Sequence, residues 1–237
     1  MKPLISAHRG GAPREGQSAA QRYAAAIAMG VDFIEFDVRK SGDGVAMVCH
    51  DDCTASGRPI RDFAYADLTS ELGPEALTFE EILDIAAGRT GLHLDLKEPG
   101  YEDDVVEALR ARHVDRFVIT SEDVVVKTIK HRHPELEVGL SLGDELKGAP
   151  PWRRLQVRLG EAFPGRRIRA CGADFVAVHW QLADFNVLRY CARRQVPAWV
   201  WTVDDERDLA RFIADPRVTT VITNHPEAAL RLRTEAG

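Results

Sequence analysis

The sequence of 237 residues has few cysteines, no long apolar run and no excess of basic residues. Its cysteines, Cys49, Cys53, Cys171 and Cys191, lack the spacing of a zinc site and are too few for a disulfide-stabilised scaffold. No stretch approaches the ~18 apolar residues of a membrane span. The N-terminus enters a strand-like run directly, without the apolar core of a signal peptide. These absences favour a reduced, cytoplasmic protein.

The charge balance argues against one class of partner. Lys and Arg number 31 and Asp and Glu number 37, which gives a formal net charge of −6. A protein that binds nucleic acid through its overall charge would be basic. We therefore expect a small-molecule ligand rather than nucleic acid, and the sequence says nothing of the oligomeric state.

Strand-like and helix-like segments alternate along the whole chain. The expected strands are Leu4–Ala7, Phe33–Val38, Leu92–Leu96, Arg116–Thr120, Glu137–Ser141, Asp174–Val178, Ala198–Thr202 and Thr219–Thr223. The expected helices are Ser18–Met29, Thr78–Ala87, Asp103–Arg112, Glu122–His131, Leu182–Arg194, Glu206–Ala214 and Pro226–Arg233. Eight strands with intervening helices favour an α/β fold, a single (β/α)8 TIM barrel, over an open doubly wound sheet. No linker divides the chain, so we expect one domain over residues 1–237.

Two segments interrupt the alternation. The turn Ser41–Gly44 predicts a hairpin between Phe33–Lys40 and Val45–Cys49, which would fold His50 over the barrel mouth. Residues 51–77 then form a short insertion over the same mouth. The basic, irregular segment Lys147–Arg169 is expected to form a helix and loop on the outside of the protein.

Four polar clusters follow short apolar runs: His8-Arg9-Gly10, Glu35-Phe36-Asp37, His50-Asp51 and Asp95-Leu96-Lys97. In a barrel, active residues lie at the carboxyl ends of the strands, and side chains two residues apart on a strand share a face. Other polar or aromatic strand ends join them at Thr120, Ser141, His179, Trp201 and Asn224. Buried charge is costly unless it is paired or bound to metal, so carboxylates that converge beside cations suggest a metal and a phosphate. Oxygen ligands suit Mg²⁺ or Ca²⁺.

These motifs resemble, over nearly the whole chain, those of the glycerophosphodiester phosphodiesterases. The family's His-Arg-Gly, Glu-x-Asp-Val, His-Asp and Glu-x-Lys motifs match the four clusters in order. Its Trp-Thr-Val-Asn and Ile-Thr-Asp-x-Pro signatures match Trp201–Asp204 and Ile222–Pro226.

The resemblance implies a barrel enzyme that hydrolyses glycerophosphodiesters to glycerol 3-phosphate and an alcohol. It implies one divalent ion, Mg²⁺ or Ca²⁺ with Mn²⁺ as a further possibility, held by carboxylates that match Glu35, Asp37 and Asp95. Residues matching His8 and His50 would act as general acid and base, in an order left open. Those matching Arg9 and Lys97 would stabilise phosphoryl charge. Glu15 would orient Arg9 or support the metal, and Trp201 would pack on the glycerol end of the substrate.

Three departures from the family pattern leave alternatives open. Asp95 replaces a Glu, Gly16 replaces an Asn, and the 51–77 insertion is short. A more open mouth would suit a lysophospholipid-type phosphodiesterase of the same fold. The altered positions would suit a non-catalytic pseudoenzyme that binds an anion.

The remaining histidines are expected to be caps or surface residues, except one. They are His93, His113, His131, His133 and His225. His179, at the end of an expected strand, is left undecided.

Overall fold

The computed structural model describes residues 2–143 and 163–236, together with residues 150, 152, 157, 160 and 161. About half of the segment Lys147–Arg169, for which an outer helix and loop were expected, therefore lies outside the described residues.

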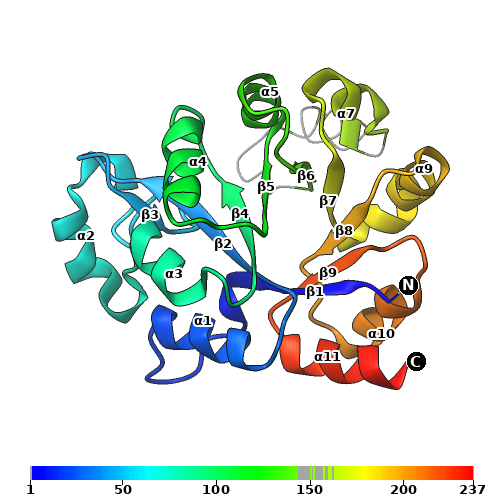
Figure 1. Cartoon of the computed structure of the whole chain (residues 1–237), viewed down its shortest axis with the longest axis horizontal. Coiled ribbons are helices and arrows are strands. Elements are labelled where there is room, and N and C mark those ends of the chain that lie inside the picture. Colours follow the sequence, from blue (N-terminus) through cyan, green and yellow to red (C-terminus); the bar gives the residue numbers. More distant parts are fainter. Residues whose placement is uncertain are drawn as a thin grey trace.

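Eight parallel strands close into a barrel (Figure 1). They are β1 (Leu4–Ala7), β2 (Phe33–Lys40), β4 (Gly91–Leu96), β5 (Phe117–Ser121), β6 (Val138–Leu142), β7 (Phe175–His179), β8 (Ala198–Trp201) and β9 (Thr220–Thr223). The order runs β1-β9-β8-β7-β6-β5-β4-β2, and β1 also pairs with β2. This last pairing closes the sheet and confirms the TIM barrel over the open doubly wound sheet.

Helices follow the strands and surround the barrel (Figure 1). They are α1 (Ala19–Ala28), α3 (Phe79–Ala86), α4 (Glu102–Ala111), α5 (Asp123–Arg132), α7 (Gly165–Cys171), α9 (Leu188–Arg194), α10 (Glu206–Ala214) and α11 (Pro226–Glu235). A capping box begins α3, in which Thr78 and Glu81 each accept from the other's backbone amide. The expected helix Leu182–Arg194 is instead a short α8 (Trp180–Leu182), a π-helical turn over Ala183–Val187, and α9.

The lower barrel interior is filled with aromatic and apolar side chains. Phe33, Phe175 and Trp199 form its centre, and the ring centroids of Phe175 and Trp199 lie 4.8 Å apart. Gly139 on β6 makes room for them, since a Cβ there would lie 2.3 Å from the Phe175 ring. This layer forms an apolar floor beneath the polar strand ends.

The expectation that His93 is a cap or surface residue is wrong. His93 is buried inside the barrel, with Nε2 3.0 Å from Thr120 Oγ1 and Nδ1 3.4 Å from Ser6 Oγ. The alternation of β4 explains this position, since His93 shares the interior face of Asp95. Burial lowers the pKa of His93 to about 4, so the ring is neutral.

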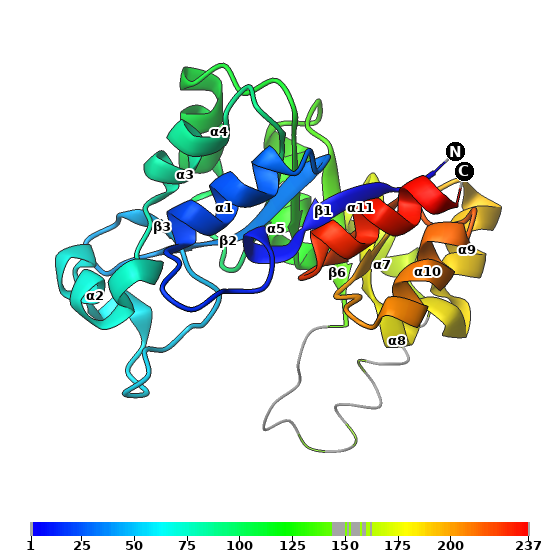
Figure 2. The same cartoon turned by 90° about the horizontal axis from the view of Figure 1, so that it is seen from below.

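The insertion after β2 has more structure than the sequence indicated. The short β3 (Ala46–Val48) pairs antiparallel with β2, as the hairpin predicted. The helix α2 (Tyr65–Leu72), which was not expected from the sequence, lies beside β3 (Figure 2). Met47, Ile60, Phe63 and Leu68 form a separate apolar cluster here. Over the described residues, no helix is long and apolar enough to cross a membrane.

Candidate active site

A strained turn after β1 begins the site. Residues His8–Gly10 form one 3₁₀ turn, in which Arg9 has a φ of 49°. Positive φ is uncommon for a residue with a side chain, and such strain clusters at functional sites. Gly10 follows with a φ of 75°, and a Cβ there would lie 2.9 Å from the Tyr23 ring. The turn places the Arg9 backbone amide 2.9 Å from Glu35 Oε2. It also places the Nε atom of the Arg9 side chain 3.1 Å from Asp37 Oδ2.

Two carboxylates stand side by side on the strands β2 and β4. Asp37 and Asp95 are register partners across these strands. The Lys97 ammonium lies between them, 2.8 Å from Asp37 Oδ1 and also paired with Asp95. The cation relieves the repulsion that two adjacent carboxylates would otherwise feel. The contacts confirm the prediction that these side chains share one face.

Burial and neighbouring charges separate the properties of the acids. Burial raises the pKa of Glu35 well above its ordinary value, and the charges of Asp37 and Asp95 raise it further. Burial also acts to raise the pKa of Asp37, but Lys97, Arg9 and His50 outweigh it and the pKa is lowered. Three carboxylates thus face two cations, and Glu35 is the one whose neutral form is favoured.

His8 lies between the acidic cluster and the end of β9. Its Nδ1 is 2.8 Å from Asn224 Oδ1, and its Nε2 is 3.9 Å from Glu35 Oε2. Burial lowers the pKa of His8, and the adjacent Arg9 lowers it further. The neutral imidazole, which can accept a proton, is therefore favoured.

His50 occupies the opposite, more open side of the cluster. The amide of the preceding Cys49 donates to the backbone carbonyl of Asp37, which places His50 beside the end of β2. Its Nδ1 is 2.8 Å from Asp51 Oδ1, and its side chain is 44% exposed. Because Asp51 only accepts, the proton lies on Nδ1 and Nε2 is left available.

Asp95 is held firmly by groups that the sequence analysis did not assign to it. Thr120 Oγ1 donates to Asp95 Oδ1 at 2.8 Å, and Ser141 Oγ lies 3.5 Å from the same oxygen. Lys97 occupies the other oxygen. The shorter side chain of Asp95 is thus tied to β4, β5 and β6.

Two other predicted site residues have different surroundings. Glu15 is exposed, and the Arg9 guanidinium pairs with Asp37 instead. Trp201 packs on the aromatic floor and meets His179 edge to face at 5.2 Å. The buried indole N–H of Trp201 has no hydrogen-bond partner within the described part of the chain. Trp201 therefore lies in the upper barrel, with a donor that remains available.

The donor set suits a hard divalent cation in chemistry. Glu35, Asp37 and Asp95 offer oxygen atoms only, and the raised pKa of Glu35 indicates that its charged form is disfavoured without a further cation beside it. In the geometry of the described residues, however, no three His, Cys, Asp or Glu side chains are grouped closely enough to hold an ion. Lys97 stands where Asp37 and Asp95 would have to meet.

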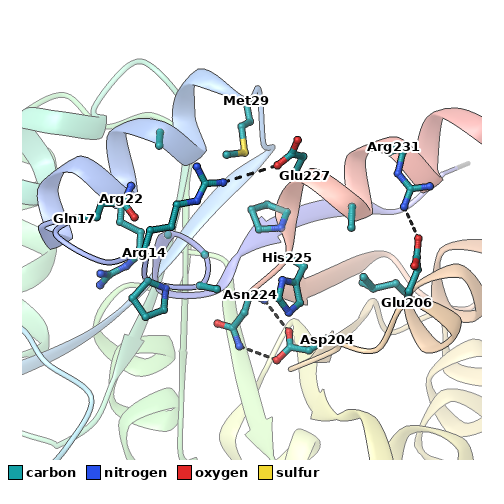
Figure 3. Close-up of a pocket in the computed structure, with 18 residues that line it drawn as sticks. Arg14, Gln17, Arg22, Met29, Asp204, Glu206, Asn224, His225, Glu227 and Arg231 are labelled. Atoms are coloured by element: carbon teal, nitrogen blue, oxygen red, sulfur yellow. Dashed lines mark hydrogen bonds and ion pairs between the residues drawn. The ribbon is translucent and has the colours of Figure 1, made fainter.

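A groove lies outside the barrel, between α1 and α11 (Figure 3). This α1–α11 groove has a volume of about 670 Å³ and shares Asn224 and Asp204 with the surroundings of His8. Arg14 faces Glu227 across it at 3.9 Å, and Arg231 pairs with Glu206. Its cations Arg14 and Arg231 are thus both matched by acids.

A family model matches residues 8–228, and its description is glycerophosphoryl diester phosphodiesterase family. The chain belongs to this family. It is therefore a member of an enzyme family, as the motifs predicted.

Individual members of the family support the assignment. A glycerophosphodiester phosphodiesterase of Caldanaerobacter subterraneus subsp. tengcongensis is 25% identical over 259 residues, covering 100% of both proteins. A crystal structure of a glycerophosphodiester phosphodiesterase from Parabacteroides distasonis matches with a TM-score of 0.79 and 22% identity, covering 100% of this chain and 99% of that one. A phosphodiesterase of Oleispira antarctica, in complex with the product sn-glycerol-3-phosphate, matches with a TM-score of 0.74 and 19% identity, covering 98% and 96%. At these identities the two structures support the fold alone.

Proposed function

We propose that this protein hydrolyses glycerophosphodiesters to glycerol 3-phosphate and an alcohol, with a divalent metal ion and two histidines. The observation that carries the proposal is the cluster at the barrel mouth. There two cations, three carboxylates and the Nε2 atom of His8 converge above an apolar floor. The family relationship and the product named for the Oleispira antarctica phosphodiesterase support this substrate class.

In the proposed reaction, a glycerol hydroxyl beside the phosphate attacks phosphorus. One histidine takes the hydroxyl proton and the other gives a proton to the leaving alcohol as its P–O bond breaks. Water then opens the cyclic phosphate in the reverse sense. His8 and His50 each direct Nδ1 to an acceptor, so each would present Nε2 to the substrate. Arg9 and Lys97 would face the phosphoryl oxygens and offset their growing charge.

We assign the metal ion to Glu35, Asp37 and Asp95. Such an ion, Mg²⁺, Ca²⁺ or Mn²⁺, would act as a Lewis acid on a phosphoryl oxygen. Lys97 would have to give up part of its contact with the two aspartates to the ion or the phosphate. Thr120 would hold Asp95 in place for this role.

The test is release of glycerol 3-phosphate from glycerophosphocholine and glycerophosphoethanolamine, with a lysophospholipid assayed in parallel. The protein is treated with EDTA and then given Mg²⁺, Ca²⁺ or Mn²⁺. We expect EDTA to abolish hydrolysis and one of the ions to restore it. We also expect His8→Ala and His50→Ala each to reduce the rate of hydrolysis by at least ~100-fold. His131→Ala is the matched control, because His131 is exposed on α5.

Each departure from that pattern has a definite meaning. Turnover of the lysophospholipid alone would move the substrate class to lipids. Hydrolysis that persists in both histidine variants would contradict the proposed chemistry. Folded protein without turnover under any ion would favour the pseudoenzyme.

A further inference from the structure

His8 is connected to Asp204, an acid to which the sequence motifs gave no role. Asn224 Oδ1 lies 2.8 Å from His8 Nδ1. On its far side, Asn224 Nδ2 donates to Asp204 Oδ2 at 2.8 Å, and the Asn224 backbone amide donates to Asp204 Oδ1 at 2.9 Å. Both bonds between Asn224 and Asp204 are visible in Figure 3. Asp204 therefore holds both the main chain and the side chain of Asn224.

The donors and acceptors in this chain of hydrogen bonds can be assigned in only one way. An ionised carboxylate accepts and cannot donate, so the amide group of Asn224 must face Asp204. The carbonyl oxygen of Asn224 then faces His8, and His8 Nδ1 must carry the proton. In the neutral ring this leaves Nε2 unprotonated, on the side of Glu35. The opposite orientation of Asn224 would set a carbonyl against a carboxylate at 2.8 Å.

We propose that Asp204, acting through Asn224, is a positioning residue that fixes His8 in the Nδ1–H tautomer with Nε2 free for proton transfer. The proposal rests on the proposed function for its role in catalysis, but the tautomer itself is a property of the resting protein. Asp204 touches neither the acidic cluster nor the cations at the mouth. Besides holding Asn224, Asp204 accepts a hydrogen bond from Thr223 Oγ1 at 3.3 Å, and its charge acts to raise the pKa of His8.

The geometry offers an isosteric way to reverse that orientation. In Asp204→Asn, the backbone amide of Asn224 still requires an acceptor at Oδ1 of residue 204. The new amide group then occupies the position of Oδ2 and faces the amide group of Asn224. Two donors repel, so Asn224 turns over and donates to His8 Nδ1. The neutral ring is forced into the Nε2–H tautomer.

The exchange of both residues restores the original pattern. In Asp204→Asn/Asn224→Asp, residue 224 is a carboxylate that accepts from His8 Nδ1 and from the amide group of residue 204. The backbone amide of residue 224 keeps its acceptor. All the hydrogen bonds survive, and His8 returns to the Nδ1–H tautomer.

The experiment reads the tautomer directly and activity separately. Long-range ¹H–¹⁵N correlation spectra of the histidine side chains are recorded well above the ordinary histidine pKa of about 6.5. His8 is assigned by the signals that His8→Gln removes. Glu206→Gln is the matched control, since it removes a neighbouring acid that pairs with Arg231 instead. Steady-state kinetics on glycerophosphocholine accompany each spectrum.

We expect Nδ1–H in the wild type, Nε2–H in Asp204→Asn, and Nδ1–H again in the double variant and in Glu206→Gln. We expect kcat to fall roughly 10- to 100-fold in Asp204→Asn with little change in KM, and to recover in the double variant. A wild-type Nε2–H tautomer, or an Asp204→Asn spectrum like the wild type, would overturn the proposal. So would a double variant that stays in the Nε2–H form. If the wild type hydrolyses no diester, the proposed function fails, yet the spectra still decide the tautomer.

Discussion

At the scale of single residues, the site depends on the balance between its acidic and basic side chains. Asp37 and Asp95 stand side by side on adjacent strands, and Lys97 is the group that makes this arrangement tolerable. Burial acts to lower the pKa of Lys97, but the two aspartates outweigh it and raise the pKa, so the ammonium stays charged. The same cation is then available to an anionic substrate.

Removal of this cation should abolish most activity. We expect Lys97→Met to lower kcat/KM by about 100-fold or more, in the range for loss of one charged transition-state donor. Lys40→Met is the matched control, because Lys40 lies on the same sheet and pairs with Asp104 near the surface. Circular dichroism of both variants shows whether the fold is kept. Wild-type activity in folded Lys97→Met would mean that Lys97 is only a structural partner of the aspartates.

Sequence motifs identified the charged residues of the cluster, because each motif sits directly after a strand. They could not identify the bonds between motifs. The positive φ of Arg9, the donor from Thr120 to Asp95 and the contact of Asp204 with Asn224 depend on strand register and loop shape. The family resemblance assigned Glu15 to Arg9 or to the metal, whereas in the structure Glu15 is exposed and Arg9 pairs with Asp37.

At the scale of elements, the barrel is closed by its terminal segments. The strand β1 pairs with both β9 and β2, and the site uses residues that lie on β2 or directly follow β1 and β9. Asp32, just before β2, accepts from the Ile5 amide at 2.8 Å and pairs with Arg233 of α11. One side chain thus joins β1, the start of β2 and the last helix.

We expect Asp32→Ala to destabilise the protein by roughly 1–3 kcal/mol, because it leaves a backbone amide and a cation without their partner. Denaturant unfolding monitored by tryptophan fluorescence measures the change. Asp104→Ala is the control, since Asp104 is 64% exposed and should change stability by no more than ~0.5 kcal/mol. Equal stabilities for the two variants would show that Asp32 does not hold the closure together.

Element types were predictable because apolar runs and capping residues are local signals. All eight strands and the hairpin after β2 were expected, and the residues concerned form them. The helix α2 was missed because its segment buries little, with Leu68 as its buried residue. The π-helical turn before α9 was also missed, since nothing in the local sequence distinguishes it from a continuous helix.

At the scale of the whole molecule, the barrel mouth and the α1–α11 groove hold different sets of charged side chains. The mouth holds the convergent carboxylates, Lys97, Arg9 and both histidines. The α1–α11 groove holds cations that acids already match. Asp204 and Asn224 line the α1–α11 groove, and Asn224 also contacts His8. The groove is therefore connected to His8, although we do not assign the substrate to it.

The most direct measurement is a crystal structure of the protein with Ca²⁺ and glycerol 3-phosphate. We predict the ion on Glu35, Asp37 and Asp95, and the phosphate between Arg9, Lys97 and the Nε2 atoms of His8 and His50. A phosphate bound in the α1–α11 groove by Arg14 or Arg231, with the barrel mouth empty, would contradict the account.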